Sequence, residues 1–321
     1  AFDKNWSLHR TVGILFYFFG AYLIYVIFLE KILPIDHLLW ALCVSDLVMM
    51  ISSLYEFLVF GVKRGAGLTE NANIYGANTV FICFILYYFY NISRDTKNVF
   101  INILIHFSVL TSVVISGSRQ TLLLALVFYI CMCCDFLIRY KLTLSRIISI
   151  ILLTGLVLIT VTSSYQYIFA FMYNNIYSFQ RLILGTQEAS ARIRVELIEI
   201  GLSLFVNKPI FGYGLDNFRP VSGNIYYPHN TYIDLLVSLG ILGLISYYFI
   251  YFDMFYLCVR KNNHMTKRQT YYIMFMIVSL FLNDLFTVSI NSTRTFLILF
   301  LMYLMLEKRV FYDQKDLHVL K

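Results

Sequence analysis

Charged residues are scarce in this sequence, and their scarcity excludes a protein that is surrounded by water. Only 13% of the 321 residues are charged and 60% are hydrophobic, whereas a soluble domain carries about 25% charged residues. The apolar stretches are about 20 residues long, which is enough to cross a bilayer. A transmembrane barrel would instead show short segments that alternate in polarity. We therefore predict an all-α, polytopic transmembrane protein.

The sequence also lacks the residue clusters that hold metal ions. Its six cysteines fall within apolar segments. Cys131, Cys133 and Cys134 lie close together, but no second cysteine cluster and no nearby histidine completes a zinc-type motif. We interpret the cysteines as small buried residues, and we expect neither a metal nor another cofactor.

Nine apolar runs are long enough to be membrane spans. They lie near residues 11–30, 38–62, 74–92, 99–116, 119–138, 147–165, 231–258, 269–290 and 293–307. We treat residues 1–321 as a single integral membrane domain. The chain begins with Ala1 rather than methionine, and we expect residues to be missing upstream.

One connection between the spans is long, and a compact domain rarely keeps such a connection without a function. It covers residues 166–229, and we expect a partly helical, extracytoplasmic catalytic loop. Three of the four prolines of the chain lie within it. Because proline fixes the backbone φ angle, we predict a loop of defined shape that delivers His229 and Asn230 to the next span.

Lysine and arginine in the short loops predict the orientation. Basic clusters near residues 94–97, 139–146 and 260–268 follow alternate spans, and such clusters face the cytoplasm. The long connection then faces outward. Lys4 and Arg10 are exceptions that a span missing upstream, or a first span wrongly assigned, would explain. Since the net charge of +7 lies mostly in short loops, it reports topology, and we expect no nucleic-acid partner.

Arginines on the predicted outward side need a reason beyond charge bias. In a helix through this segment, Glu188 and Glu196 lie one turn to either side of Arg192, so we interpret Arg192 as a solvated ion-pair residue. The helical neighbours of Arg194 are uncharged, and a charge on an apolar face is costly unless an anion meets it. The alternative for Arg194 is snorkelling to lipid headgroups.

Arg119 and His229 stand at the ends of spans. Arg119 follows the turn Ser-Gly-Ser, where it is either a membrane-end anchor or a guanidinium fork for diphosphate oxygens. His229 has an ordinary pKa of about 6.5, so a neutral imidazole there can take a proton from a hydroxyl group. Asn230 can cap the helix that follows. Gly240 and Gly243, farther along, favour close helix packing.

Spaced motifs carry a family resemblance. Arg119 and Leu123, in RQTLL, fit an Arg-x3-Leu element, and His229 and Gly240 fit a His-x10-Gly element. The segment RGAGLTENANIYGAN, which starts at Arg64, and the segment FGYGLDNF ahead of PHN complete the pattern. In these features the chain resembles the O-antigen ligase and O-antigen polymerase superfamily.

The resemblance implies a metal-independent glycosyltransferase of the bacterial cytoplasmic membrane. Its donor would be an undecaprenyl-diphosphate-linked glycan, with a glycan acceptor and the lipid bilayer as further partners. The arginine pair of the family maps to Arg119 and Arg194, and its essential histidine maps to His229. Family members usually have a tryptophan four residues after the second arginine. This chain has Ile198 there, which keeps Arg192 as the other choice.

We therefore expect an outward-facing site in which His229, Arg194 and Arg119 are catalytic. Six further residues are expected to contact substrate: Arg64, Asn73, Arg192, Asp216, Asn230 and Tyr232. We favour a polymerase, which joins lipid-linked repeat units into an O-antigen, capsule or exopolysaccharide, over a ligase, which transfers the glycan to a lipid or protein. A chain-length regulator and a flippase are candidate protein partners.

A transporter or flippase is the alternative from another class. Asp46 and Glu56 lie within one apolar span and His106 lies within another. Carboxylates inside the membrane are typical of ion or substrate pathways. The chain shows no internal repeat and no matched pair of broken spans, and both are features of transporters. The enzyme is therefore the favoured interpretation.

Overall fold

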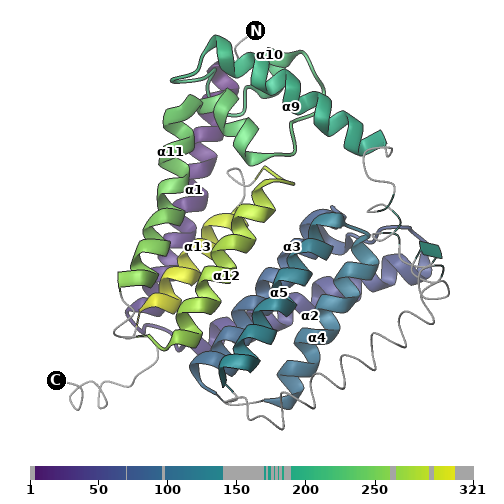
Figure 1. Ribbon diagram of the computed structural model, residues 1–321, viewed down its shortest axis with the longest axis vertical. Helices are drawn as coiled ribbons and strands as arrows, with labels where there is room; N and C mark the ends of the chain where they lie inside the picture. Colours follow the sequence, from purple (N-terminus) through teal and green to yellow (C-terminus); the bar gives the residue numbers. More distant parts are fainter. Residues whose placement is uncertain are drawn as a thin grey trace. The chain divides into compact units, whose positions relative to one another are not determined.

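The computed structural model describes residues 4–69, 71–95, 98–139, 189–260, 265–288 and 293–307, together with residues 170, 173, 174, 177, 180 and 183. Every regular element in these residues is a helix (Figure 1), which confirms the predicted all-α class. Six helices are long and apolar enough to cross a membrane. The protein is therefore a multi-pass membrane protein.

Most of the predicted spans coincide with described helices. Six match long apolar helices: α1 (Lys4–Leu29), α2 (Ile35–Val59), α3 (Ala72–Tyr87) with the π-helical turn η2 (Tyr88–Ser93), α4 (Val99–Ser116), α5 (Arg119–Arg139) and α11 (Thr231–Arg260). The last two are α12 (Lys267–Asp284) and α13 (Thr293–Leu306), both shorter than predicted. With 14 residues, α13 falls below the roughly 20 that a full crossing needs. The predicted span at 147–165 lies outside the described residues.

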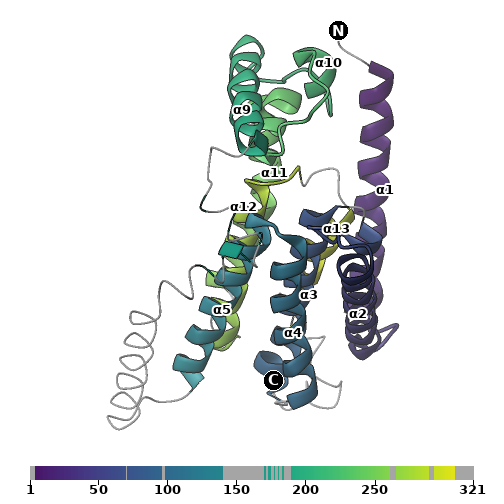
Figure 2. The ribbon, with the colours of Figure 1, turned by 90° about the vertical axis from the view of Figure 1, so that its right-hand side faces the viewer.

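The long connection is partly helical, as predicted. It contains α9 (Ala189–Asn207) and the short α10 (Phe218–Ser222). Figures 1 and 2 show both helices at the end of α11 where that helix begins. A buried apolar cluster holds them there, formed by Leu197, Phe218, Ile233 and Val237. The connection is thus packed onto α11 by its own core.

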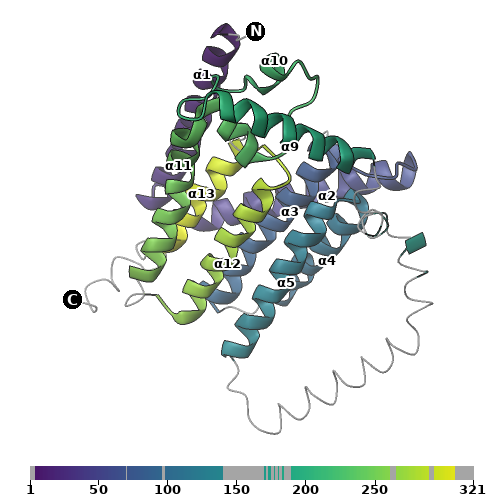
Figure 3. The same cartoon turned by 45° about the horizontal axis from the view of Figure 1, so that its top comes forward.

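The helices fall into two compact units. The first comprises residues 1–44, 85–97 and 186–321, and the second comprises 45–84 and 98–185. In the first unit α1 packs along α13, and α11 packs against α9, α12 and α13. In the second unit α4 and α5 are adjacent helices joined by a short turn (Figure 3). Each unit holds part of the predicted set of site residues.

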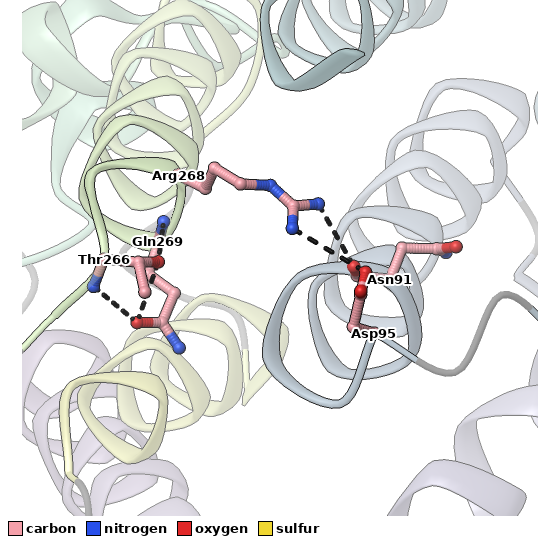
Figure 4. Close-up of polar contacts among 5 residues, drawn as sticks. All are labelled: Asn91, Asp95, Thr266, Arg268 and Gln269. Carbon is pink, nitrogen blue, oxygen red and sulfur yellow. Dashed lines mark hydrogen bonds and ion pairs between the residues drawn. The ribbon is translucent and has the colours of Figure 1, made fainter. Parts of the chain in front are cut away.

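Basic residues gather at one end of the first unit. A capping box starts α12, and Arg268 next to it contacts the carbonyl oxygen of Asn91 at 3.2 Å and the carboxylate of Asp95 at 3.7 Å (Figure 4). Arg94 pairs with Asp36 at the start of α2. The loop that precedes α11 lies at the opposite end, because α12 runs for 18 residues between Arg268 and the carbonyls that Asn230 and Thr231 contact.

Candidate functional site

His229 stands at the start of α11 in a strained backbone conformation. Its φ angle is +49°, in the left-handed region that residues other than glycine rarely adopt and that is common at functional sites. The next residue, Asn230, caps α11 by accepting the N–H of Ile233 at 3.1 Å, as predicted. The cap starts the helix after His229 and leaves the imidazole in the loop.

The end of α12 braces the same position. Asn230, Thr231 and Tyr232 each donate a side-chain hydrogen bond to a backbone carbonyl at or just beyond the end of α12, at 3.4, 2.6 and 3.1 Å respectively. Two of these residues, Asn230 and Tyr232, were predicted to contact substrate. In the structure they support His229, and their contact with substrate stays a prediction.

A buried polar network lies behind this brace. Tyr248 and Tyr251 donate to Oδ2 of Asp284 at 3.0 and 3.2 Å, and Arg294 at the start of α13 interacts electrostatically with the same carboxylate. A buried carboxylate is tolerated when it is paired and hydrogen-bonded. This network was not predicted from the sequence. The available signal was Arg294, a cation on the side that the positive-inside rule disfavours.

Arg194 lies near His229. It projects half-buried from α9, whereas Arg192 is exposed. Burial lowers the pKa of His229, and the positive charge of Arg194 lowers it further, to about 4. The imidazole is therefore neutral at physiological pH, which is the form that can accept a proton. Its ring also packs on Tyr227, with the two centroids 4.2 Å apart.

The ion pair predicted between Arg192 and Glu196 is not formed. Arg192 and Glu196 are both exposed, and no ion pair within 4.0 Å joins them among the described side chains. The physical reason is that an exposed ion pair gains little free energy over hydration of the two charges and costs side-chain entropy. Glu188 lies outside the described residues. The two arginines are still distinct, because only Arg194 affects His229.

The segment between α9 and α10 is wedged into a break in α11. Gly240 interrupts this helix with φ 66° and ψ −163°. Two loop amides, from Tyr213 and Gly214, donate to α11 carbonyls at 2.9 and 2.7 Å. Two α11 amides just after Gly240 donate to carbonyls of Pro209 and Ile210 at 2.8 and 3.4 Å. The loop thus satisfies backbone groups that the break removes from the helix ladder.

Only glycine fits at this break. A Cβ atom at Gly240 would lie 2.2 Å from the carbonyl oxygen of Ile210, so the His-x10-Gly spacing joins the histidine to the anchoring point of its own loop. The predicted helix-to-helix packing is wrong for Gly240, and for Gly243 it stays a prediction. Gly240 admits loop backbone, and a Cβ at Gly243 would meet Leu239 of the same helix at 2.0 Å, across the kink.

Asp216, a predicted substrate contact, pairs with the first helix. Nε of Arg10 lies 2.8 Å from Oδ2 of Asp216. The pair places the start of α1 at the same end of the first unit as the His229 loop. It also gives Arg10, an exception to the predicted charge bias, a structural partner. Any contact of Asp216 with substrate stays a prediction.

Arg119, Arg64 and Asn73 come together in the second unit. Helix α4 ends at Gly117 with φ +54°, and Arg119, two residues later, begins α5. Arg64 donates from Nε to the carbonyl oxygen of Ser116 at 2.8 Å and from Nη2 to Oδ1 of Asn73 at 2.6 Å. The turn that presents Arg119 is therefore clamped by two residues that were predicted to bind substrate.

A pocket of about 390 Å³ lies next to this turn. Its lining combines aromatic rings, amides and one amine, from Phe57, Lys63, Tyr173, Asn174, Tyr177 and Gln180. A Cβ at Gly117 would lie 2.9 Å from the Tyr177 ring and 3.2 Å from Cγ of Arg64, so the pocket adjoins the arginine clamp. Aromatic surfaces with a few polar groups are typical of small-molecule sites.

Comparison with known families matches the same part of the chain. Residues 104–248 match the family model described as O-antigen ligase. This match confirms the resemblance to the O-antigen ligase and O-antigen polymerase superfamily. It includes Arg119, Arg194, His229 and Gly240, whereas Arg64 and Asn73 precede it. A direct comparison with curated proteins finds no match.

Two of the three residues that suggested a transport path, Glu56 and His106, have structural roles in the second unit. Glu56 accepts two backbone N–H groups, from residues 66 and 67, both at 2.8 Å. His106 stacks on Tyr129 with ring centroids 5.8 Å apart. Asp46 is fully buried. Glu56 thus closes a loop and His106 packs two helices, so the O-antigen ligase family match is the stronger guide to function.

Proposed function

We propose that the protein is a glycosyltransferase that polymerises undecaprenyl-diphosphate-linked oligosaccharide repeat units into a surface polysaccharide. It would act on the outer face of the bacterial cytoplasmic membrane. The proposal rests on the proximity of two groups: Arg194 lies close enough to His229 for its charge to lower the pKa of the partly buried imidazole. A proton acceptor next to an anion-binding group is the pair that glycosyl transfer from a lipid diphosphate requires.

In the proposed reaction, the oxygen of an acceptor hydroxyl bonds to the anomeric carbon of the donor sugar. The bond from that carbon to the diphosphate oxygen breaks, and the diphosphate leaves with the electron pair. His229 takes the hydroxyl proton, and Arg194 stabilises the charge of the leaving diphosphate. A bound diphosphate offsets the charge of Arg194, so it raises the pKa of His229 when a base is needed.

Arg119 is proposed as the second arginine on its motif alone. It belongs to the second unit, where the pocket beside its turn has a lining suited to a sugar ring. Guanidinium groups would supply the charge stabilisation that other transferases take from a divalent ion. We therefore propose that turnover of the purified protein persists in excess chelator.

The outer-face assignment rests on charge. In the first unit Arg94, Arg260 and Arg268 lie at the end opposite His229, and basic residues favour the cytoplasmic side. A cysteine introduced by Ile225→Cys should therefore react with a membrane-impermeant thiol reagent in intact cells. Labelling only after lysis would contradict the orientation.

The central experiment replaces the proposed base. In a strain that lacks the chromosomal copy, His229→Ala should reduce polymer formation by about 10²–10⁴-fold, the usual contribution of a positioned acid–base group. His37→Ala is the matched control, because His37 is an exposed histidine at the start of α2. Normal polymer from His229→Ala at equal protein level would remove His229 from the base role.

A ligase is the second candidate, because the matching family model is described as O-antigen ligase. The same deletion strain separates the two reactions. Loss of a polymerase leaves an acceptor that carries one repeat unit. Loss of a ligase leaves long polymer on the lipid carrier and none on the final acceptor. Accumulation of lipid-linked polymer in the deletion strain would therefore show that the protein is a ligase and not a polymerase.

A further inference from the structure

The most exposed apolar residues of α9 and of the segment that follows it lie next to the break in α11. Val206, Ile210 and Phe211 are 74%, 53% and 75% exposed. On α9 they follow the exposed side chains of Val195 and Leu202, which share a helix face with the exposed Glu199. An exposed apolar cluster such as Val206, Ile210 and Phe211 marks a contact with lipid or protein.

The exposed side chains of α11 show where this helix meets lipid. Exposed apolar residues begin at Ile241 and Leu242 and end at Val259. At about 1.5 Å per residue this stretch is about 27 Å long, close to the roughly 30 Å of a hydrocarbon core. At Gly240 the helix kinks, and its first part folds back so that the Tyr232 ring stacks on the Tyr248 ring with centroids 5.0 Å apart. The boundary of the hydrocarbon core therefore falls near Gly240.

Helix α1 gives an independent measure of the same boundary. Residues 11–29 carry no charged side chain and make a helix about 28 Å long. Arg10, just before them, pairs with Asp216 at 2.8 Å. Asp216 follows closely on Gly214, whose amide donates to the Ser238 carbonyl at 2.7 Å. Two helices thus place the boundary at the level of one loop.

We propose that residues 206–211 are a membrane anchor that inserts Val206, Ile210 and Phe211 among the lipid acyl chains, just below the headgroups. Hydrogen bonds from this loop to the α11 backbone on both sides of Gly240 fix its depth. Its apolar surface is continuous with the lipid-facing residues Ile241 and Leu242. The partner is therefore the bilayer itself.

Lys208 is compatible with this position, although it lies inside the anchor. Its ammonium group stands over the ring of Tyr213, 4.6 Å from the centroid. A lysine can bury its aliphatic stem and keep its charge at the headgroup level. The charge is thus held over the Tyr213 ring.

The test uses tryptophan fluorescence in vesicles of phosphatidylcholine whose acyl chains carry bromine, a contact quencher. The two native tryptophans are removed by Trp6→Phe and Trp40→Phe. The full chain then carries Phe211→Trp or, as the matched control, Ile225→Trp. Ile225 is 82% exposed and lies in the loop between α10 and α11, which we expect on the water side of the boundary.

Phe211→Trp should lose about half of its emission in brominated vesicles, because an interfacial side chain sits about 5–10 Å into the acyl region. Bromine near the headgroup should quench it more than bromine near the terminal methyl. Ile225→Trp should lose little. Equal quenching of the two variants, or none in Phe211→Trp, would overturn the proposal. If Phe211→Trp does not fold, Val206→Trp is measured instead, and no turnover is needed.

Discussion

The two units hold their candidate residues by different means. In the second unit a short turn between adjacent helices presents Arg119, and the fork of Arg64 clamps that turn. In the first unit His229 depends on a helix cap, on carbonyls at the end of α12 and on a loop anchored at Gly240. The arginine turn is mostly local, whereas the histidine is placed by distant segments. Substitutions far from His229 should therefore affect it more.

The largest expected effect separates the two arginines of α9. Arg194→Ala should lower the initial rate of glycan transfer by about 10²–10³-fold, the usual cost of losing a group that stabilises developing charge. Arg192→Ala is the matched control and should change the rate little, because this side chain is exposed. Arg194→Lys should restore little if a two-pronged contact is needed. A larger loss of rate in Arg192→Ala than in Arg194→Ala would assign the stabilisation of the leaving diphosphate to Arg192.

The next effect concerns the anchoring point of the histidine loop. Gly240→Ala places a Cβ 2.2 Å from the Ile210 carbonyl at a positive φ, so it should destabilise the protein by about 1–3 kcal/mol or more and lower its activity. Gly20→Ala is the control, because nothing lies within 4 Å of its added Cβ. Thermal unfolding in detergent measures the stability of both variants. An unchanged melting temperature for Gly240→Ala would contradict the tight fit.

A smaller effect is expected in the second unit. Arg64→Lys keeps the charge but lacks the fork that reaches Ser116 and Asn73 from two separate nitrogens, so the turn before Arg119 loosens. One hydrogen bond from a charged group contributes about 1.5–3 kcal/mol, and we expect about a tenfold loss of activity from partial misplacement, equal to about 1.4 kcal/mol. Arg94→Lys, in an ion pair at the far end of the first unit, should change activity less. Equal losses of activity in Arg64→Lys and Arg94→Lys would show that the Arg64 clamp has no special role.

The smallest effect is a shift in titration. The pKa of His229 is about 4, lowered first by burial and then by Arg194. Arg194→Gln removes the second cause, so the pKa should rise while staying below its ordinary value of about 6.5. Arg192→Gln should leave it unchanged. NMR of protein labelled at histidine, with the His229 signal assigned by its loss in His229→Ala, gives both values. An unchanged pKa of His229 in Arg194→Gln would show that Arg194 does not influence His229.

Some of this site could be predicted and some could not. The apolar surroundings of Arg194 in the sequence predicted that its charge serves another group, and Arg194 does lie near His229. The pair of Arg192 with Glu196 was predicted by helical spacing alone, which cannot weigh hydration against contact. The pairing of Arg10 with Asp216 joins residues more than 200 positions apart, and no local pattern indicates it.

Composition and the length of apolar runs determined the membrane class, most of the spans and the cap at Asn230, because these depend on residue type and local spacing. Tertiary structure decided the rest. Gly240 lies in an apolar run and has the sequence context of an ordinary packing glycine. Only the folded chain shows that a loop enters the helix there, because its hydrogen bonds join backbone groups that every residue has and no side-chain pattern records.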